Sequence, residues 1–115
     1  MKRGEIWWAD MGAHRPLEQT GRRPVVVWQS DALTRVLHSV LIVPLTTNVN
    51  RAHLAGTSII SATPAGPPTD SVALAFQLRA IPRSALSSRI RSLTESELSE
   101  LELATDEALG RVDPD

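Results

Sequence analysis

The pattern of apolar and polar positions divides the chain into a first part typical of β-strands and a last part typical of a helix. Short β-branched, apolar runs bounded by Gly, Pro and polar residues indicate strands. They predict strands at residues 5–10, 23–30, 39–45, 57–61 and 71–79, and a short last strand at 89–91. Residues 31–36 are compatible with one helical turn, and the Pro-rich stretch 62–68 predicts a loop.

The last part of the chain predicts one helix over residues 94–109. Thr94 and Glu97 have the spacing of a capping box, and Leu93 and Leu98 stand where a hydrophobic staple would place them. Positions at helical spacing predict the packed side: Leu98, Leu101, Thr105, Ala108 and Leu109. Gly110 fits the end of the helix.

This order of elements predicts the fold class. Several short strands followed by one terminal helix are typical of a mainly β fold with α (α+β), here a small β-barrel over about residues 1–92 with a C-terminal helix. The length of 115 residues and the lack of a linker predict a single domain over 1–115. So small a barrel leaves apolar surface uncovered, which is compatible with a dimer.

Composition excludes several classes of protein. The chain has no cysteine, which excludes a disulfide scaffold and any Cys-ligated metal site. No apolar run approaches the roughly 20 residues that a membrane helix needs. The first residues lack the apolar core of a signal peptide, so we expect a cytoplasmic protein.

The net charge of -1 conceals an uneven distribution. Residues 1–92 hold eleven basic and five acidic residues, a net charge of +6, whereas residues 93–115 hold one basic and eight acidic residues, a net charge of -7. The first part therefore suits a nucleic-acid partner, and we expect the acidic helix to lie away from it. With three Trp, one Phe and no Tyr, the chain would contact nucleic acid through Arg and short polar side chains rather than a broad aromatic platform.

Two segments hold candidate functional residues. Residues 14–24 place several ionisable groups around Gly21, directly before a buried strand. They form either a solvated hairpin loop or a site carried on a rigid scaffold. Residues 44–48 place two hydroxyls and an amide after an apolar strand, where they either cap the strand or serve as hydrogen-bond donors.

Four blocks together resemble the MazF/PemK family of toxin endoribonucleases. They are R-G-E-I-W-W-A-D at 3–10, E-Q-T-G-R-R-P at 18–24, V-P-L-T-T-N at 43–48, and the segment 70–81 that ends in Q-L-R-A-I. The resemblance implies an SH3-like barrel with a C-terminal helix that acts as a homodimer. It implies cleavage of single-stranded RNA, often mRNA, at short sequences, with no metal or other cofactor. It also implies a cognate antitoxin of the MazE type, which blocks the RNA groove.

The resemblance also assigns residues to the site. It implies that Arg23 and Thr46 are catalytic and that Glu18 is an acidic loop residue near them. It points to segments lining the RNA path, whose candidates are Gln19, Arg22, Thr47, Asn48, Gln77 and Arg79. The histidines fall in none of the matched motifs, and we interpret His14, His38 and His53 as structural or exposed.

Metal-free cleavage of RNA uses the substrate's own 2′-hydroxyl, which attacks the adjacent phosphorus and leaves a 2′,3′-cyclic phosphate and a 5′-hydroxyl. The planar fork of Arg23 suits two phosphate oxygens, and the Thr46 hydroxyl can donate one more hydrogen bond. Arginine, with a pKa above about 12, is a poor base at neutral pH. Glu18 is the better candidate for the base, although it could instead pair with Arg22 or Arg23.

Two other classes of protein remain as alternatives. A non-catalytic toxin of the same fold could poison DNA gyrase, but such a protein has no use for Arg23 and Thr46. A non-catalytic SH3-like binding module usually has a groove rich in aromatic residues, which this composition does not favour.

Overall fold

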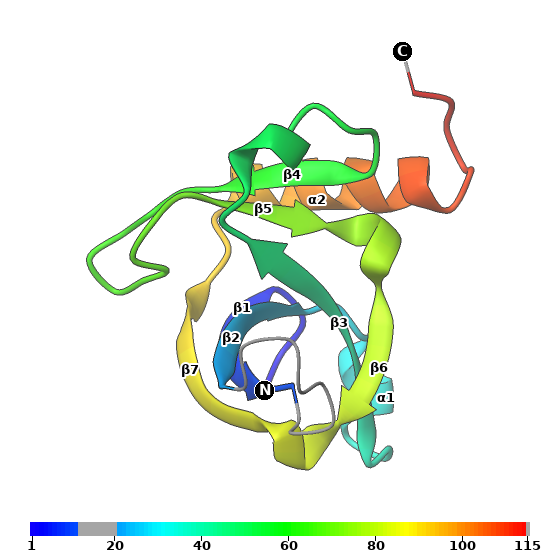
Figure 1. The fold of residues 1–115 in the computed structure, drawn as a ribbon. Helices are drawn as coiled ribbons and strands as arrows, with labels where there is room; N and C mark the ends of the chain where they lie inside the picture. The colour runs from blue at the N-terminus through cyan, green and yellow to red at the C-terminus, as the bar shows by residue number, and fades with distance from the viewer. Residues whose placement is uncertain (12–20, 115) are drawn as a thin grey trace.

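The computed structural model describes residues 1–11 and 21–114, which form a curled sheet with one long helix (Figure 1). The strands are β1 (Glu5–Asp10), β2 (Arg22–Val27), β3 (Ser39–Thr46), β4 (Thr57–Ile60), β5 (Ser71–Leu74), β6 (Arg79–Pro82) and β7 (Leu86–Ser92). The helices are α1 (Asp31–Thr34) and α2 (Glu95–Ala108), and the 3-10 turns are η1 (Val49–Arg51), η2 (Ala75–Gln77) and η3 (Arg83–Ala85). Within the described ranges, no helix has the length and apolar character needed to cross a bilayer.

Strand β3 connects the two parts of the sheet. The strand order is β4-β5-β3-β2-β1-β7, with all neighbours antiparallel, and β6 pairs with β3 outside this path. The first half of β3, from Ser39 to Ile42, pairs with β6, whereas Leu45 and Thr46 pair with β5. One edge of β3 therefore pairs with two different strands, β6 along its first half and β5 at its end.

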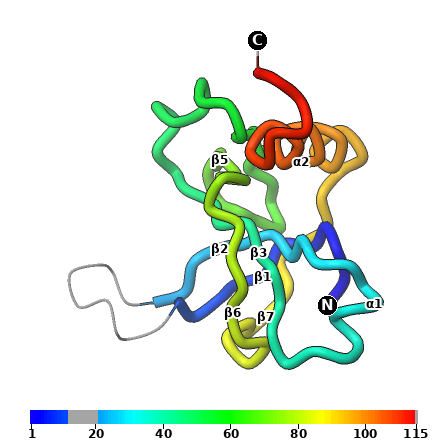
Figure 2. The backbone as a smooth tube through the Cα atoms, turned by 90° about the vertical axis from the view of Figure 1, so that its right-hand side faces the viewer, coloured from blue at the N-terminus to red at the C-terminus, as the bar shows by residue number. Residues whose placement is uncertain are grey.

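The predicted α+β class is confirmed, but the sheet is not a closed barrel. Among the described residues, no pairing joins β6 to β7. The turn η3 lies between these two strands, and β7 leaves it to pair with β1. The sheet therefore curls round without closing (Figure 1). Figure 2 shows α2 at the top, above β1, β2 and β3.

Two apolar clusters form the core, one on each face of the sheet. Val26 and Val43 point into the first cluster, which includes Leu101 and Ala104 of α2. Val25, Val27 and Ile42 alternate with them and point into the second cluster, which includes Ile81 of β6. Strands β2 and β3 are therefore buried on both faces, and α2 covers only the first.

The prediction of one strand over 71–79 is wrong. That segment contains β5, then the turn η2, then the start of β6. The turn allows the chain to leave the second half of β3 and return to pair with its first half. Because both pieces are apolar enough to be strands, the pattern did not reveal the break. The last strand is also longer than predicted, since β7 begins at Leu86.

The predicted start and end of the C-terminal helix are confirmed. The Thr94 hydroxyl accepts a hydrogen bond from the Glu97 N–H at 3.1 Å, and a Glu97 carboxylate oxygen accepts one from the Thr94 N–H at 3.0 Å. Gly110 has a φ of +74°, which suits a residue that follows a helix end.

The predicted packed side of this helix is only partly right. Leu101 is buried as predicted, but Ala104 is buried instead of Ala108. Leu109 is 62% exposed, because it caps the C-terminal end of α2, where the first cluster has ended. Thr105 is half-buried, and its hydroxyl accepts a hydrogen bond from the indole N–H of Trp28 at 2.9 Å.

A bidentate ion pair between Arg91 and Glu97 fixes the start of α2 to the sheet and to the loop at 61–66. Arg91 of β7 donates to both carboxylate oxygens of Glu97, at 2.8 and 3.1 Å, and to the carbonyl oxygens of Ser61 and Gly66 at 3.0 Å. Burial by itself raises the pKa of Glu97. The hydrogen bonds from Arg91 and from the N–H groups of Thr94 and Ser61 outweigh that effect and lower the pKa to about 2.

We predict that Glu97→Gln lowers the free energy of unfolding at pH 7 by on the order of 3 kcal/mol, because it leaves a largely buried Arg91 without its anion. Since the folded pKa of Glu97 is below its unfolded value, its contribution is complete above about pH 4.5 and is lost as the pH falls towards 2. Urea unfolding at several pH values measures both effects.

The matched control is Glu102→Gln, which removes the other half of an exposed pair with Arg3 at 3.4 Å. We expect that change to cost less than about 1 kcal/mol. Equal losses for the two variants would contradict the role given to the Arg91–Glu97 pair.

Candidate functional site

Three polar side chains lie on the face of the sheet that carries the second apolar cluster. Arg23 of β2, Thr46 of β3 and Arg79 of β6 each stand an even number of positions from a residue of that cluster in the same strand. Because successive side chains of a strand alternate between faces, all three belong to this face. Helix α2 packs on the opposite face, so most of the acidic charge lies away from Arg23, Thr46 and Arg79.

Arg23 and Thr46 lie in neighbouring strands, just beyond the end of their pairing. Val25 lies opposite Pro44 in the last pair of the two strands, and the same register continued by two positions would set Arg23 across from Thr46. The paired part of β2 and β3 ends at Val25 and Pro44, next to Pro24, and neither proline has an N–H to donate. Arg23 is exposed, and no hydrogen bond or ion pair joins its side chain to the described part of the chain.

Thr46 has a defined orientation and a free donor. Its hydroxyl oxygen accepts a hydrogen bond from the Asn48 N–H at 3.2 Å, which leaves the hydroxyl hydrogen available to donate. The side-chain oxygen of Asn48 in turn accepts from the Asn50 N–H at 3.2 Å and caps η1. Capping at the strand end is therefore confirmed, and it orients Thr46 rather than competing with a functional role.

Arg22 lies on the other face of β2. Its guanidinium carbon is 5.1 Å from the centre of the Trp8 ring, a distance at which a cation and a ring attract each other. The adjacent residues Arg22 and Arg23 therefore belong to different surroundings, which their order in the sequence does not reveal.

The remaining candidates lie on two neighbouring turns. Thr47 and Asn48 are exposed just before η1, and Gln77 is exposed in η2. The Arg51 guanidinium lies 5.5 Å from the centre of the Phe76 ring and links the two turns. Thr47, Asn48 and Gln77 thus lie near the end of β3, where its pairing partner changes from β6 to β5.

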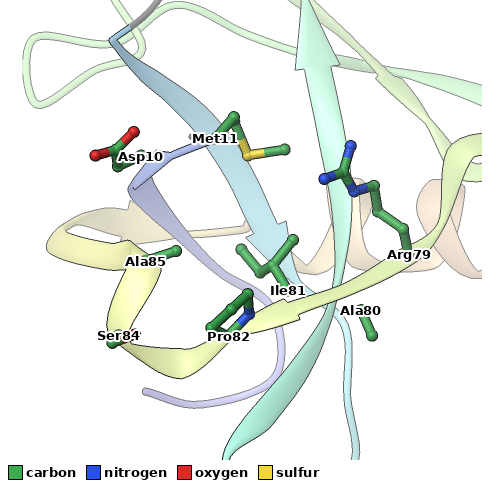
Figure 3. A pocket seen from close by; sticks show the side chains of 8 residues that line it. All are labelled: Asp10, Met11, Arg79, Ala80, Ile81, Pro82, Ser84 and Ala85. Atoms are coloured by element: carbon green, nitrogen blue, oxygen red, sulfur yellow. The ribbon is translucent and has the colours of Figure 1, made fainter. Parts of the chain in front are cut away.

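A cavity of about 340 Å³ opens beside Arg79 (Figure 3). Its lining comes from the end of β1, from β6 and from η3: Asp10, Met11, Arg79, Ala80, Ile81, Pro82, Ser84 and Ala85. Apart from Arg79, sequence reasoning missed these residues. The alternation of Arg79 with the buried Ile81 was the available signal, but the predicted strand over 71–79 ended at Arg79.

Several sequence candidates are not placed. Glu18, Gln19 and His14 lie outside the described residues. His38 and His53 are exposed. In residues 1–11 and 21–114, no three His, Asp or Glu side chains gather in a way that could hold a metal ion.

Comparison with known proteins defines the class. The family described as PemK-like, MazF-like toxins of type II toxin–antitoxin systems matches residues 2–109. The chain is 30% identical over 110 residues to the endoribonuclease MazF of Staphylococcus epidermidis, covering 96% of this chain and 92% of that protein. It is 35% identical over 109 residues to the endoribonuclease MazF9 of Mycobacterium tuberculosis, covering 90% and 92%.

A solved structure shows the same fold. It is an endoribonuclease in complex with its cognate antitoxin from a mycobacterial species, with a TM-score of 0.77, 22% identity and coverage of 99% of each chain. A small β fold with a C-terminal helix is therefore the architecture of this class of toxin. The chain belongs to the PemK-like, MazF-like toxin family of type II toxin–antitoxin systems.

The different surroundings of Arg22 and Arg23 give a prediction about stability. Arg22→Ala should lower the free energy of unfolding by about 0.5–1 kcal/mol, because it removes the cation from the Trp8 ring. Arg23→Ala should stay within about 0.5 kcal/mol of wild type, because its side chain is exposed. Urea unfolding followed by tryptophan fluorescence measures both. A larger loss for Arg23→Ala would mean that this arginine has a structural role.

Proposed function

We propose that this protein is a sequence-specific endoribonuclease that cuts single-stranded RNA, typically mRNA, without a metal ion. The observation that carries the proposal is that Arg23 and Thr46 lie on one face of the sheet, in neighbouring strands and just beyond the last pair that joins them. There the guanidinium has no partner in the described part of the chain, and the hydroxyl has a hydrogen left to donate. This pair suits a phosphate group, because both residues supply donors to its oxygens.

The reaction begins with the 2′-oxygen of the substrate, which attacks the adjacent phosphorus as its proton passes to a base. The bond from phosphorus to the 5′-oxygen breaks, and that oxygen takes a proton from an acid. The products are a 2′,3′-cyclic phosphate and a 5′-hydroxyl. Arg23 binds two phosphate oxygens with its planar fork and can also protonate the leaving oxygen. Thr46 donates to the charge that develops on the phosphate.

The base in this proposal is Glu18. Arginine, with a pKa above about 12, holds its proton too tightly to act as a base at neutral pH, whereas a glutamate is ionised there. Glu18 precedes Arg23 by five positions and lies outside the described residues, so its role rests on residue chemistry and on the family resemblance.

RNA on both sides of the cut would be held by the other polar residues. Gln19 precedes Gly21 by two positions, Thr47, Asn48 and Gln77 lie on the turns beside β3, and Arg79 lies on the same face as Arg23. Arg22 packs against Trp8 on the other face of β2 and would reach only RNA that passes the end of that strand. The amide, hydroxyl and guanidinium groups of these residues suit the edges of unstacked bases and the phosphates between them.

The proposed partners follow from the same cationic face. A MazE-like antitoxin would inhibit the toxin by covering Arg23 and Thr46 with a segment that offers carboxylates in place of phosphates. The family resemblance favours a homodimer that acts in the cytoplasm, where mRNA is available.

Removing either proposed phosphate ligand should reduce kcat by about 10²–10³-fold, because each acts on charge that forms in the transition state. We expect this loss for Arg23→Ala and Thr46→Val, with partial activity for Arg23→Lys, which lacks the planar fork. Thr46→Ser keeps the hydroxyl and should keep most activity. Single-turnover cleavage of a labelled RNA measures the rates.

The control is Arg111→Ala, an exposed position just after α2, which should cleave at the wild-type rate. Full activity of Arg23→Ala on a panel of RNAs would refute the proposed site.

The proposed chemistry predicts the ends of the products. Every cut should leave a 5′-hydroxyl and a 2′,3′-cyclic phosphate, and a single 2′-deoxy substitution at the cut nucleotide should abolish cleavage there. Ligation-based sequencing of 5′-hydroxyl ends and mass spectrometry measure both. Products with 5′-phosphate ends would contradict attack by the 2′-oxygen. Inhibition of gyrase supercoiling with intact RNA would favour the non-catalytic alternative.

A further inference from the structure

The cavity beside Arg79 combines an apolar wall with one cation. Ile81 is 5% exposed, and with the half-buried Met11 and Ala85 it supplies hydrophobic surface. Figure 3 shows the Arg79 side chain extending along the cavity towards the end of Met11, while the Asp10 carboxylate points away from Arg79. The cavity of about 340 Å³ falls at the small end of the range of about 300–1,000 Å³ for ligand pockets.

The Arg79 guanidinium lacks a protein partner among the described residues. No hydrogen bond, ion pair or ring contact joins it to the described part of the chain, although the residue is half-buried. Its neighbour Arg83, by contrast, donates to the carbonyl oxygen of Thr34 at 2.8 Å. A partly desolvated cation without a partner is costly unless a ligand supplies the missing acceptors. Arg79 therefore has side-chain donors that the described part of the chain does not use.

We propose that this cavity binds a guanine base of the RNA substrate and that Arg79 reads it. The flat face of the base lies against Ile81 and Met11, and the guanidinium donates two parallel hydrogen bonds to the O6 and N7 acceptors of guanine. This inference rests on the proposed ribonuclease function and adds the identity of one base that the enzyme selects.

Guanine fits because the Arg79 fork carries only donors. Adenine presents an acceptor beside a donor amino group, cytosine presents a donor amino group, and uracil offers a single carbonyl acceptor on that edge. On that edge only guanine offers two adjacent acceptors. Cytosine offers N3 and O2 on its Watson–Crick edge, so a fixed cytosine in place of guanine would overturn the inference. A bare phosphate would also accept from Arg79, but it would lose water against Ile81 and Met11 and gain no apolar contact.

The cavity lies within reach of the proposed cut. Arg79 is opposite Ile42 of β3, and Thr46 is four residues farther along the same strand and on the same face. At about 3.3 Å per residue, those four residues span roughly 13 Å. An extended RNA whose phosphate lies at Thr46 can therefore place a base within a few nucleotides of it into the cavity.

The test has a cleavage arm and a binding arm. In the first, wild type and Arg79→Gln digest a randomised RNA library, and sequencing of the cut ends gives the base preference at every position. We expect wild type to prefer guanine at one fixed position by about tenfold to a hundredfold. Arg79→Gln should lose that preference and shift towards adenine, because a glutamine amide matches adenine N6 and N7.

The binding arm does not require cleavage. Selection from a randomised 2′-fluoro RNA library, which has no 2′-hydroxyl, should enrich guanine with wild type and not with Arg79→Gln. Arg35→Gln, an exposed arginine that follows α1, is the matched control and should retain the guanine preference in both arms. Guanine enrichment without cleavage of ordinary RNA would support this pocket while overturning the proposed function.

Replacing the selected guanine by 7-deazaguanine identifies the atom that is read. We expect wild type to lose about tenfold in affinity, and Arg79→Gln to lose nothing further, because each change removes the same hydrogen bond. Cleavage by wild type with no fixed guanine, or a guanine preference that survives Arg79→Gln, would overturn the inference. Insensitivity of wild type to 7-deazaguanine would also overturn it and would assign Arg79 to a phosphate.

Discussion

The structure depends on two adjacent strands, β2 and β3, that are buried on both faces. Val26 and Val43 face the cluster under α2, while Val25 and Ile42 face the second cluster. A shift of register by one residue would exchange these two sets and place each against the wrong partner. The register is thereby fixed, and with it the side of the sheet on which every later side chain of β2 and β3 lies.

The same constraint explains why the functional candidates lie where they do. The alternation that buries Val25 continues to Arg23, and the alternation that buries Ile42 continues to Thr46. Polar side chains at the ends of these two strands are exposed to water, because they lie beyond the buried part of the face. The core meanwhile holds the strands that carry them rigid. The acidic helix covers the opposite face, so its carboxylates do not neutralise the arginines of this one.

Local signals predicted much of the fold. The capping box at Thr94, the end at Gly110 and the strand at β1 were readable because each depends on residues close together in sequence. The break between β5 and β6 was not readable, since it depends on how two pieces of chain share β3. The opening between β6 and β7 could not be predicted either, because β7 follows β6 in the chain yet pairs with β1, about 80 residues away in sequence.

For the site, the sequence by itself determined which residue types were available: the arginines, the Thr-Thr-Asn turn and the separation of positive from negative charge. Only the tertiary structure decided how they are grouped. It placed Arg22 against the Trp8 ring, because β1 pairs with β2. It joined Arg79 to the apolar surface of Met11 and Ile81, because β6 pairs with the first half of β3 and returns the chain towards the end of β1. The order of residues does not predict that pairing directly, because packing between distant segments determines it.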